Sequence, residues 1–101
     1  MDYQVIWMDE AIADLKSIVR QIACDHPEVA LHWGEKIRQR PLVLAQHPRL
    51  GRRFEKLARD DVREVNVPPY RIIYFIQDAT RTVWILTVWH GARPEPDLQL
   101  P

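Results

Sequence analysis

Three strand-like segments separated by two very short connections form the second half of this 101-residue chain. Residues 62–67, 70–77 and 82–89 are rich in β-branched and aromatic side chains, as strands are. Only Pro68-Pro69 joins the first two segments, and only residues 78–81 join the second two. Connections this short favour hairpins, so the three strands should form one antiparallel sheet.

Uninterrupted pairing along both hairpins assigns each side chain to one face of the sheet, because side chains alternate along a strand. Val67 should then pair with Tyr70, and Gln77 with Thr82. The face expected to pack on the helices carries, besides Arg63, the residues Val65, Val67, Tyr70, Ile72, Tyr74, Ile76, Val83, Ile85, Thr87 and Trp89. The opposite face carries Glu64, Asn66, Arg71 and His90 near one end, and Ile73, Phe75, Trp84, Leu86 and Val88 beyond them.

The first half of the chain predicts a short strand followed by two helices. Residues 3–8 are a short run of β-formers, and apolar residues at three- and four-residue steps in 12–22 indicate an amphipathic helix. A second helix begins at Asp25-His26-Pro27, where Asp25 can cap it and Pro27 fits its first turn. Pro41 inside this helix should kink or divide it. Its expected buried stripe is Ala30, Trp33, Ile37 and Leu44. The fold class is therefore α+β, with a helical hairpin packed on one face of the sheet.

The chain contains no internal repeat and no Gly/Ser linker, so residues 1–101 are expected to form one domain. Residues 94–101 should be a flexible tail. The single cysteine, Cys24, excludes an intrachain disulfide and is expected to be a buried structural thiol. No apolar run is long enough for a membrane span, and the start of the chain lacks signal-peptide features. We therefore expect a cytoplasmic protein with no membrane partner.

The formal net charge of zero conceals a strong asymmetry along the chain. Residues 1–35 carry seven acids and two bases, whereas residues 36–93 carry twelve bases and five acids. Eleven of the fourteen basic residues are arginine, which favours planar recognition of carboxylate and phosphate. The balance argues against a uniformly basic nucleic-acid binder. It leaves a basic segment that suits an acidic partner.

Two helices cover only one face of the sheet, so the other face should expose large apolar side chains that await a partner. The densest local charge is the run 47–53, which Lys56 and Arg59 continue. This run is either a binding surface for phosphates or acidic protein, or simply a solvated loop.

A second group, Arg71, His90, Glu64 and Asn66, lies on the predicted open face. Imidazole near neutrality transfers protons, and arginine stabilises the charge that develops at phosphorus when a 2′-hydroxyl attacks it. The alternative is that Arg71 only pairs with Glu64 and that His90 only ends a strand. The four histidines lack metal-ligand spacing, so we expect neither a metal nor another cofactor.

An ordered set of short motifs resembles the RelE/ParE toxin family across residues 5–93. The set comprises Trp7, Ala11, Asp14-Leu15, Ile18, Asp25-His26-Pro27, His47-Pro48, Gly51-Arg52, Val62-Arg63-Glu64-Val65, Pro69-Tyr70-Arg71-Ile72-Ile73-Tyr74 and Ile85-Leu86-Thr87-Val88-Trp89-His90-Gly91-Ala92-Arg93. The resemblance implies the toxin of a bacterial type II toxin–antitoxin pair, often called a plasmid stabilisation protein, with a curved antiparallel sheet. It also implies a hetero-oligomer with an antitoxin that has a DNA-binding domain and an acidic flexible segment.

The family divides by target, and each branch implies different site residues. ParE-like members inhibit growth through DNA gyrase, and the ending His90-Gly91-Ala92-Arg93 is more similar to this branch. RelE-like members cut messenger RNA in the ribosome without a metal, and Arg71 matches an arginine that they use. Gly91 stands where a second catalytic arginine is expected, and no tyrosine follows Arg93. A third alternative is an inactive homologue that only binds antitoxin and aids autoregulation of the operon.

These alternative functions give three sets of candidate residues. The target-binding set for gyrase is Arg49, Arg52, Arg53, Lys56 and Arg59. The antitoxin-binding set is Arg71, Ile73, Phe75, Trp84, Leu86 and His90. Catalytic roles arise only under the nuclease alternative, with Arg71 and Arg93 stabilising phosphate charge and His90 acting as acid or base.

Overall fold

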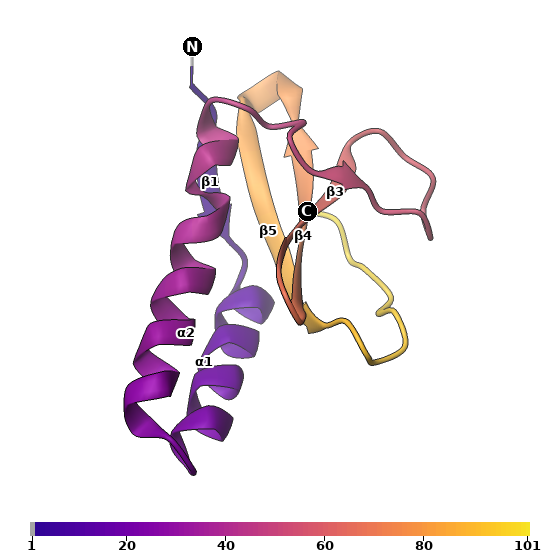
Figure 1. Cartoon of the computed structure of the whole chain (residues 1–101). Coiled ribbons are helices and arrows are strands. Elements are labelled where there is room, and N and C mark those ends of the chain that lie inside the picture. The colour runs from indigo at the N-terminus through magenta and orange to yellow at the C-terminus, as the bar shows by residue number, and fades with distance from the viewer. Residues whose placement is uncertain (1) are drawn as a thin grey trace.

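The computed structural model describes residues 2–101 as a five-stranded mixed sheet with two helices on one of its faces (Figure 1). The elements in chain order are β1 (Gln4–Trp7), α1 (Asp9–Ala23), α2 (Pro27–Gln39), a 3₁₀ helix (Arg40–Ala45), β2 (Arg52–Arg53), β3 (Val62–Val67), β4 (Tyr70–Gln77), a 3₁₀ turn (Asp78–Thr80) and β5 (Thr82–His90). The predicted α+β class and the predicted order of elements are confirmed.

The strands lie in the order β1-β5-β4-β3-β2. The three long strands β3, β4 and β5 are antiparallel, as the short connections predicted. β1 pairs in parallel with β5, with Val5 beside Val83, so the first and last strands of the chain are neighbours. The two-residue strand β2, which was not predicted, pairs with β3 and extends the sheet past the expected edge.

The second predicted helix is divided near Pro41. The α-helix α2 ends at Gln39, and residues 40–45 continue as a 3₁₀ helix. Pro41 has no N–H to donate, so it cannot extend the α-helical hydrogen-bond ladder. The change of helix type still leaves Ile37 and Leu44 fully buried against the sheet, as the expected stripe requires.

The predicted register holds in the first hairpin and breaks in the second. Val67 pairs with Tyr70 and Gln77 with Thr82, but the ladder of β4 and β5 shifts between Ile73 and Tyr74. Leu86 is the extra residue on β5 at this β-bulge, since Thr87 pairs with Ile73 and Ile85 pairs with Tyr74. A bulge reverses the faces of all residues beyond it.

The bulge moves Val88 and Trp89 to faces opposite to those predicted. Val88 now lies in the core beneath the helices, whereas Trp89 packs on the far side of the sheet. Both predicted assignments are wrong, because uninterrupted alternation was assumed along β5. The bulge lies just beyond the last residue pair of β1 and β5, which is Trp7 with Ile85. From there on the neighbour of β5 is Asp14 of α1, whose carboxylate accepts hydrogen bonds from the Thr87 hydroxyl and the Val88 N–H, at 2.5 and 3.1 Å.

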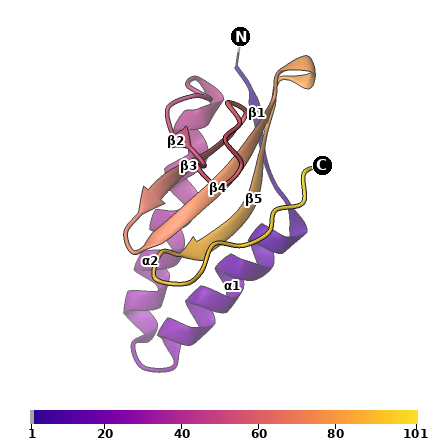
Figure 2. The same ribbon diagram turned by 90° about the vertical axis from the view of Figure 1, so that its right-hand side faces the viewer.

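The far face of the sheet is not open. Phe54, Val62, Ile73, Phe75 and Leu86 form a second buried cluster there, with Phe54 fully buried and Phe75 9% exposed. The loop between β2 and β3 supplies Phe54, and the chain after β5 crosses the same side of the sheet (Figure 2). The predicted large exposed apolar face is therefore wrong, because the chain covers it with its own segments.

Residues 94–101 contact the far face of the sheet through apolar side chains and through ion pairs. Leu98 and Leu100 are partly buried against the second cluster. Glu95 pairs with Arg71 at 3.2 Å, and Asp97 pairs with Lys56 at 3.1 Å. The expected flexibility of this segment stays a prediction.

Tyr74 connects the sheet to the loop before β2. Its ring is fully buried beneath the helices, and its hydroxyl donates to the Pro48 carbonyl at 2.7 Å while accepting from the Gly51 N–H at 3.0 Å. Burial raises the pKa of this phenol, so it stays protonated and keeps donating at physiological pH. One hydroxyl thus satisfies two backbone groups of the 48–51 loop.

Replacing Tyr74 by phenylalanine should lower the free energy of unfolding by about 1–3 kcal/mol, because the Pro48 carbonyl and the Gly51 N–H lose their partner. Urea denaturation followed by circular dichroism measures the loss. Tyr3→Phe is the matched control, since the Tyr3 hydroxyl bonds Asp78 at an exposed site. Equal effects of the two substitutions would contradict the assigned role of Tyr74.

Cys24 is exposed rather than buried, because α1 ends at Ala23 and the cysteine lies in the turn that follows. Across residues 2–101, neither α1 nor α2 has the length and apolar character required to span a bilayer.

Candidate functional site

The basic run around β2 is largely paired with acidic side chains of the same chain. Arg49 bonds both Asp60 and Asp78 at 2.9 Å. These bonds raise the pKa of Arg49 further, and the Arg49 guanidinium together with the Tyr3 hydroxyl holds the pKa of Asp78 at about 2. Arg49 therefore fastens the 47–53 loop to the turn between β4 and β5.

The other members of the predicted target-binding set have similar partners. The pairs are Arg52–Glu64, Lys56–Asp97 and Arg59–Asp61, at 3.2, 3.1 and 2.8 Å. The pairs of Lys56 and Arg59 are open to water and contribute little to stability, whereas Arg52 reaches from an exposed position to the buried Glu64 carboxylate. Within residues 2–101, Arg53 makes no ion pair. Exposed pairs of this kind exchange readily with an external anion.

Arg71 lies on the far face of the sheet in a bidentate pair with Glu64, at 2.9 and 2.6 Å. The Glu64 side chain is only 1% exposed. Burial alone would raise the pKa of Glu64, but the hydrogen bonds and charges of Arg71 and Arg52 outweigh it and lower this pKa. Arg71 and Glu64 line a polar pocket of about 290 Å³ together with Arg52, Glu55, Gly91 and Glu95.

His90 is not part of that pocket. It pairs with Tyr70 across β4 and β5, so it shares the helix-side face with Tyr70, whereas Arg71 pairs with Trp89 on the opposite face. The prediction that Arg71, Glu64, Asn66 and His90 share one face is wrong for His90. His90 lies on the other face because of the bulge at Leu86, which a single sequence does not reveal.

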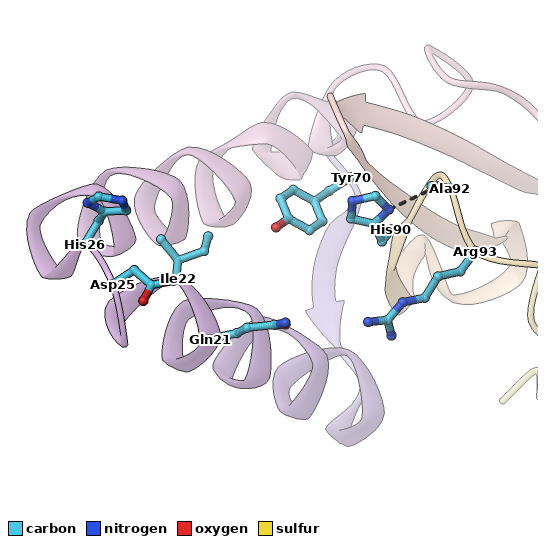
Figure 3. A pocket seen from close by; sticks show the side chains of 8 residues that line it. All are labelled: Gln21, Ile22, Asp25, His26, Tyr70, His90, Ala92 and Arg93. Atoms are coloured by element: carbon cyan, nitrogen blue, oxygen red, sulfur yellow. Dashed lines mark hydrogen bonds between the residues drawn. The ribbon is translucent and has the colours of Figure 1, made fainter.

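His90 instead lies in a cleft between the sheet and the end of α1 (Figure 3). The cleft has a volume of about 560 Å³. Its side chains come from the end of α1, the turn before α2, and the ends of β4 and β5: Gln21, Ile22, Asp25, His26, Tyr70, His90, Ala92 and Arg93. The Tyr70 ring meets His90 edge-to-face at 5.5 Å and Trp33 at 5.7 Å, which fixes its position.

Two candidates for the nuclease chemistry, His90 and Arg93, therefore meet in this cleft without Arg71. The Arg93 N–H donates to the His90 carbonyl at 3.0 Å, closing a tight turn that holds the two side chains together. Sequence reasoning missed Gln21, His26 and Tyr70 as neighbours of His90. Gln21 and His26 meet His90 only through the packing of the helical hairpin against the sheet, and Tyr70 becomes its cross-strand partner only because of the bulge in β5.

The apolar part of the predicted antitoxin-binding set is mostly covered. Ile73, Phe75 and Leu86 are at most 9% exposed, while Trp84 is partly exposed and donates to Gln77 at 3.3 Å. Among residues 2–101, no group of three or more His, Cys, Asp or Glu side chains is arranged to hold a metal ion.

Known structures share this arrangement of helices and sheet. A solved chain described as the chromosomal ParDE toxin–antitoxin system of P. aeruginosa superposes with a TM-score of 0.73 at 21% identity, over 87% of this chain and 95% of that chain. A chain of the toxin–antitoxin complex RelBE2 from Mycobacterium tuberculosis gives a TM-score of 0.56 at 26% identity, over 89% and 99% of the two chains. The fold is that of small toxins from toxin–antitoxin systems.

Sequence comparison identifies the family. A relative named Toxin RelE2, from Caulobacter vibrioides, is 36% identical over 91 residues, which are 89% of this chain and 97% of the relative. The family model described as the ParE toxin of the type II toxin–antitoxin system parDE matches residues 5–95. The chain belongs to the RelE/ParE toxin family of type II toxin–antitoxin systems.

Proposed function

We propose that this chain is a ParE-like toxin that inhibits growth by binding DNA gyrase and is neutralised by a cognate antitoxin. The observation that carries this choice is the separation of Arg71 from His90. The nuclease alternative requires Arg71 and His90 at the same phosphate, with Arg93 as a second cation. Arg71 is bound to a buried carboxylate on one face, and His90 lies on the other. This separation supports a binding toxin over a nuclease.

The proposed gyrase-binding surface is the basic strip of Arg49, Arg52, Arg53, Lys56 and Arg59. Arg52 and Arg53 form β2 at one edge of the sheet. Arg49 lies in the loop before this strand, and Lys56 and Arg59 lie in the loop after it. Apart from the buried Glu64, which pairs with Arg52, their acidic partners are at least 31% exposed, so an acidic target competes for these pairs at small cost. The strip is thus suited to recognise carboxylate or phosphate on a large partner.

The proposed antitoxin segment is acidic and partly apolar, and the far face of the sheet offers matching groups. Glu95 and Asp97 already pair with Arg71 and Lys56 there, while Leu98 packs on the apolar cluster. An antitoxin segment of similar composition would compete with residues 94–101 for the same contacts. The solved relative from Mycobacterium tuberculosis is a toxin–antitoxin complex, which supports an antitoxin partner here.

The relative named Toxin RelE2 keeps a ribosome-dependent endoribonuclease as the second candidate. That activity would require Arg71 to leave Glu64 and act on the RNA phosphate with Arg93 and His90. The two functions predict different early events in a cell.

Inducing the protein in bacteria should stop DNA synthesis first and raise an SOS response, as measured with labelled precursors of DNA, RNA and protein. His90→Gln should retain toxicity, and so should the double variant Glu64→Gln/Arg71→Gln, which leaves no buried carboxylate unpaired. Arg53→Gln/Lys56→Gln should lower toxicity by about tenfold, because charged hydrogen bonds to the target are lost.

Arg81→Gln is the matched control, since Arg81 is exposed at the turn between β4 and β5 and belongs to neither surface. Early loss of translation with cut transcripts, abolished by His90→Gln, would establish the nuclease instead. Normal growth on induction, with antitoxin still bound, would identify an inactive homologue.

A further inference from the structure

The helical hairpin carries an apolar groove between α1 and α2, which lie side by side in Figures 1 and 2. This α1–α2 groove has a volume of about 560 Å³. Its residues come from both helices: Leu15, Lys16, Val19 and Arg20 from α1, and Ala30, Leu31, Gly34, Glu35 and Arg38 from α2. These residues are separate from the basic strip and from the cleft beside His90. The groove is therefore a surface that the proposed gyrase binding does not use.

The groove arises where small residues of α2 face α1. A Cβ added at Gly34 would lie 3.0 Å from Cγ2 of Val19, so the two helices are in close contact at this point. Ala30 lies four residues before Gly34 and is also small and buried. Small residues on α2 thus leave space beside Leu15 and Val19 that the described side chains do not fill.

Leu31 lines this groove and is open to solvent. Among residues 2–101 it is the most exposed large apolar side chain, at 75%. Glu28 lies three residues before Leu31 and Glu35 four residues after it, so the three side chains share one face of α2. Glu35 bonds Arg38, but both side chains are more than half exposed, so this pair exchanges readily. An apolar side chain between two carboxylates thus lies beside an apolar groove.

The α1 side of the groove has the opposite charge. Lys16 and Arg20 are four residues apart and share one face of α1. Within the described range 2–101, Lys16, Arg20 and Glu28 make no ion pair. A partner that fits this groove presents an exposed apolar side chain flanked by acidic groups. Leu31 with its two glutamates is such a group.

We propose that the α1–α2 groove is a self-association site, at which two copies of this chain form a twofold-symmetric dimer. Leu31 of each copy enters the groove of the other copy, and the two glutamates beside it face Lys16 and Arg20. A twofold axis exchanges the two contacts, so a surface that carries both the leucine and the groove is complementary to itself. Each contact also removes an exposed leucine from water. The basic strip stays free in this dimer.

Sedimentation velocity of the full chain, purified without antitoxin, tests the proposal over about 1–500 µM. A monomer–dimer equilibrium with a Kd of about 10–100 µM is expected, because the contact is smaller than a standard protein interface. Leu31→Gln should weaken the dimer by about tenfold or more, since the dimer loses two buried leucines. Leu42→Gln is the matched control: Leu42 is 53% exposed in the 3₁₀ helix, outside the groove. It should change the Kd by less than about twofold.

Charge reversal tests the pairing between the two copies. Lys16→Glu/Arg20→Glu and Glu28→Lys/Glu35→Lys should each lose the dimer, because like charges then face each other. An equal mixture of the two variants should associate again, since opposite charges then meet in both halves of the contact. Leu31→Gln in both chains should abolish this association as well. Circular dichroism checks that each variant stays folded.

The proposal is overturned if the wild type stays monomeric up to about 1 mM, which would leave the groove to another protein such as the antitoxin. It is also overturned if Leu31→Gln and Leu42→Gln weaken the dimer equally. Association of the charge-reversed mixture without Leu31 would overturn it too, because it would indicate unspecific attraction. Failure of this proposal is distinct from failure of the proposed function, since sedimentation requires neither gyrase nor toxicity.

Discussion

Replacing Glu64 by glutamine should lower the free energy of unfolding by about 2–4 kcal/mol, because a buried ion pair loses its acidic member. The Glu64 side chain is 1% exposed and bonds both Arg71 and Arg52. Without its charge, the partly buried Arg71 retains only Glu95, at 3.2 Å, as an acidic partner. Urea denaturation at neutral pH measures the loss.

The same variant should change the dependence of stability on pH. The pKa of Glu64 in the folded chain lies below its ordinary value of 4.5, so its contribution is fully present above that pH. The contribution is lost as pH falls through the lowered pKa of the folded state. The difference in unfolding free energy between the wild type and Glu64→Gln should therefore shrink below pH 4.5.

Glu35→Gln is the matched control for this prediction. Glu35 pairs with Arg38 on the surface of α2, and both side chains are more than half exposed. The urea midpoint of this variant should stay close to that of the wild type, because solvent screens exposed pairs. If Glu64→Gln were as stable as Glu35→Gln, the Glu64–Arg71 pair would not contribute to the free energy of unfolding, and the prediction would be wrong.

Replacing Gly51 by alanine should cost about 3 kcal/mol or prevent folding, since the added methyl group has no room. A Cβ at this position would overlap the Glu64 carbonyl oxygen of β3 and lie 2.7 Å from the Tyr74 hydroxyl. The first neighbour is backbone of the sheet and cannot move aside without breaking strand pairing. Chemical denaturation and the yield of folded protein measure the effect.

Gly34→Ala is the control with the same chemical change. The nearest atom to its added Cβ is Cγ2 of the Val19 side chain at 3.0 Å, and a side chain at the contact of α1 and α2 has some freedom to adjust. Alanine also gains about 1 kcal/mol over glycine inside a helix, which offsets the crowding. We expect Gly34→Ala to be near neutral. A loss at position 51 no greater than at position 34 would contradict the predicted clash.

The sequence predicted most of the fold because its local patterns agree with one another. Pro68-Pro69 and residues 78–81 leave space only for hairpins, and the pairing of Val67 with Tyr70 and of Gln77 with Thr82 follows directly. The buried positions Ile37 and Leu44 repeat at helical spacing, and Pro41 lies where the α-helix ends. Each of these features depends on residues that are close together in the chain, so the sequence alone is enough to predict it.

The candidate site was harder to predict because it depends on contacts between distant segments. The bulge at Leu86 reverses the face of His90, and it occurs where Asp14 of α1 replaces β1 as the neighbour of β5. The cover of the far face by Phe54 and Leu98 likewise comes from segments with no regular periodicity. A predicted group that spans a bulge therefore divides between the two faces of the sheet.

The position of β5 has a consequence for synthesis of the chain. The strand made last lies inside the sheet, between β1 and β4. A nascent chain that has not yet reached Thr82 has nothing to join its first strand to the β3–β4 hairpin, and two strand edges remain open to other chains. Nearly the whole chain must therefore leave the ribosome before the sheet closes, and a product truncated before β5 should aggregate instead of folding.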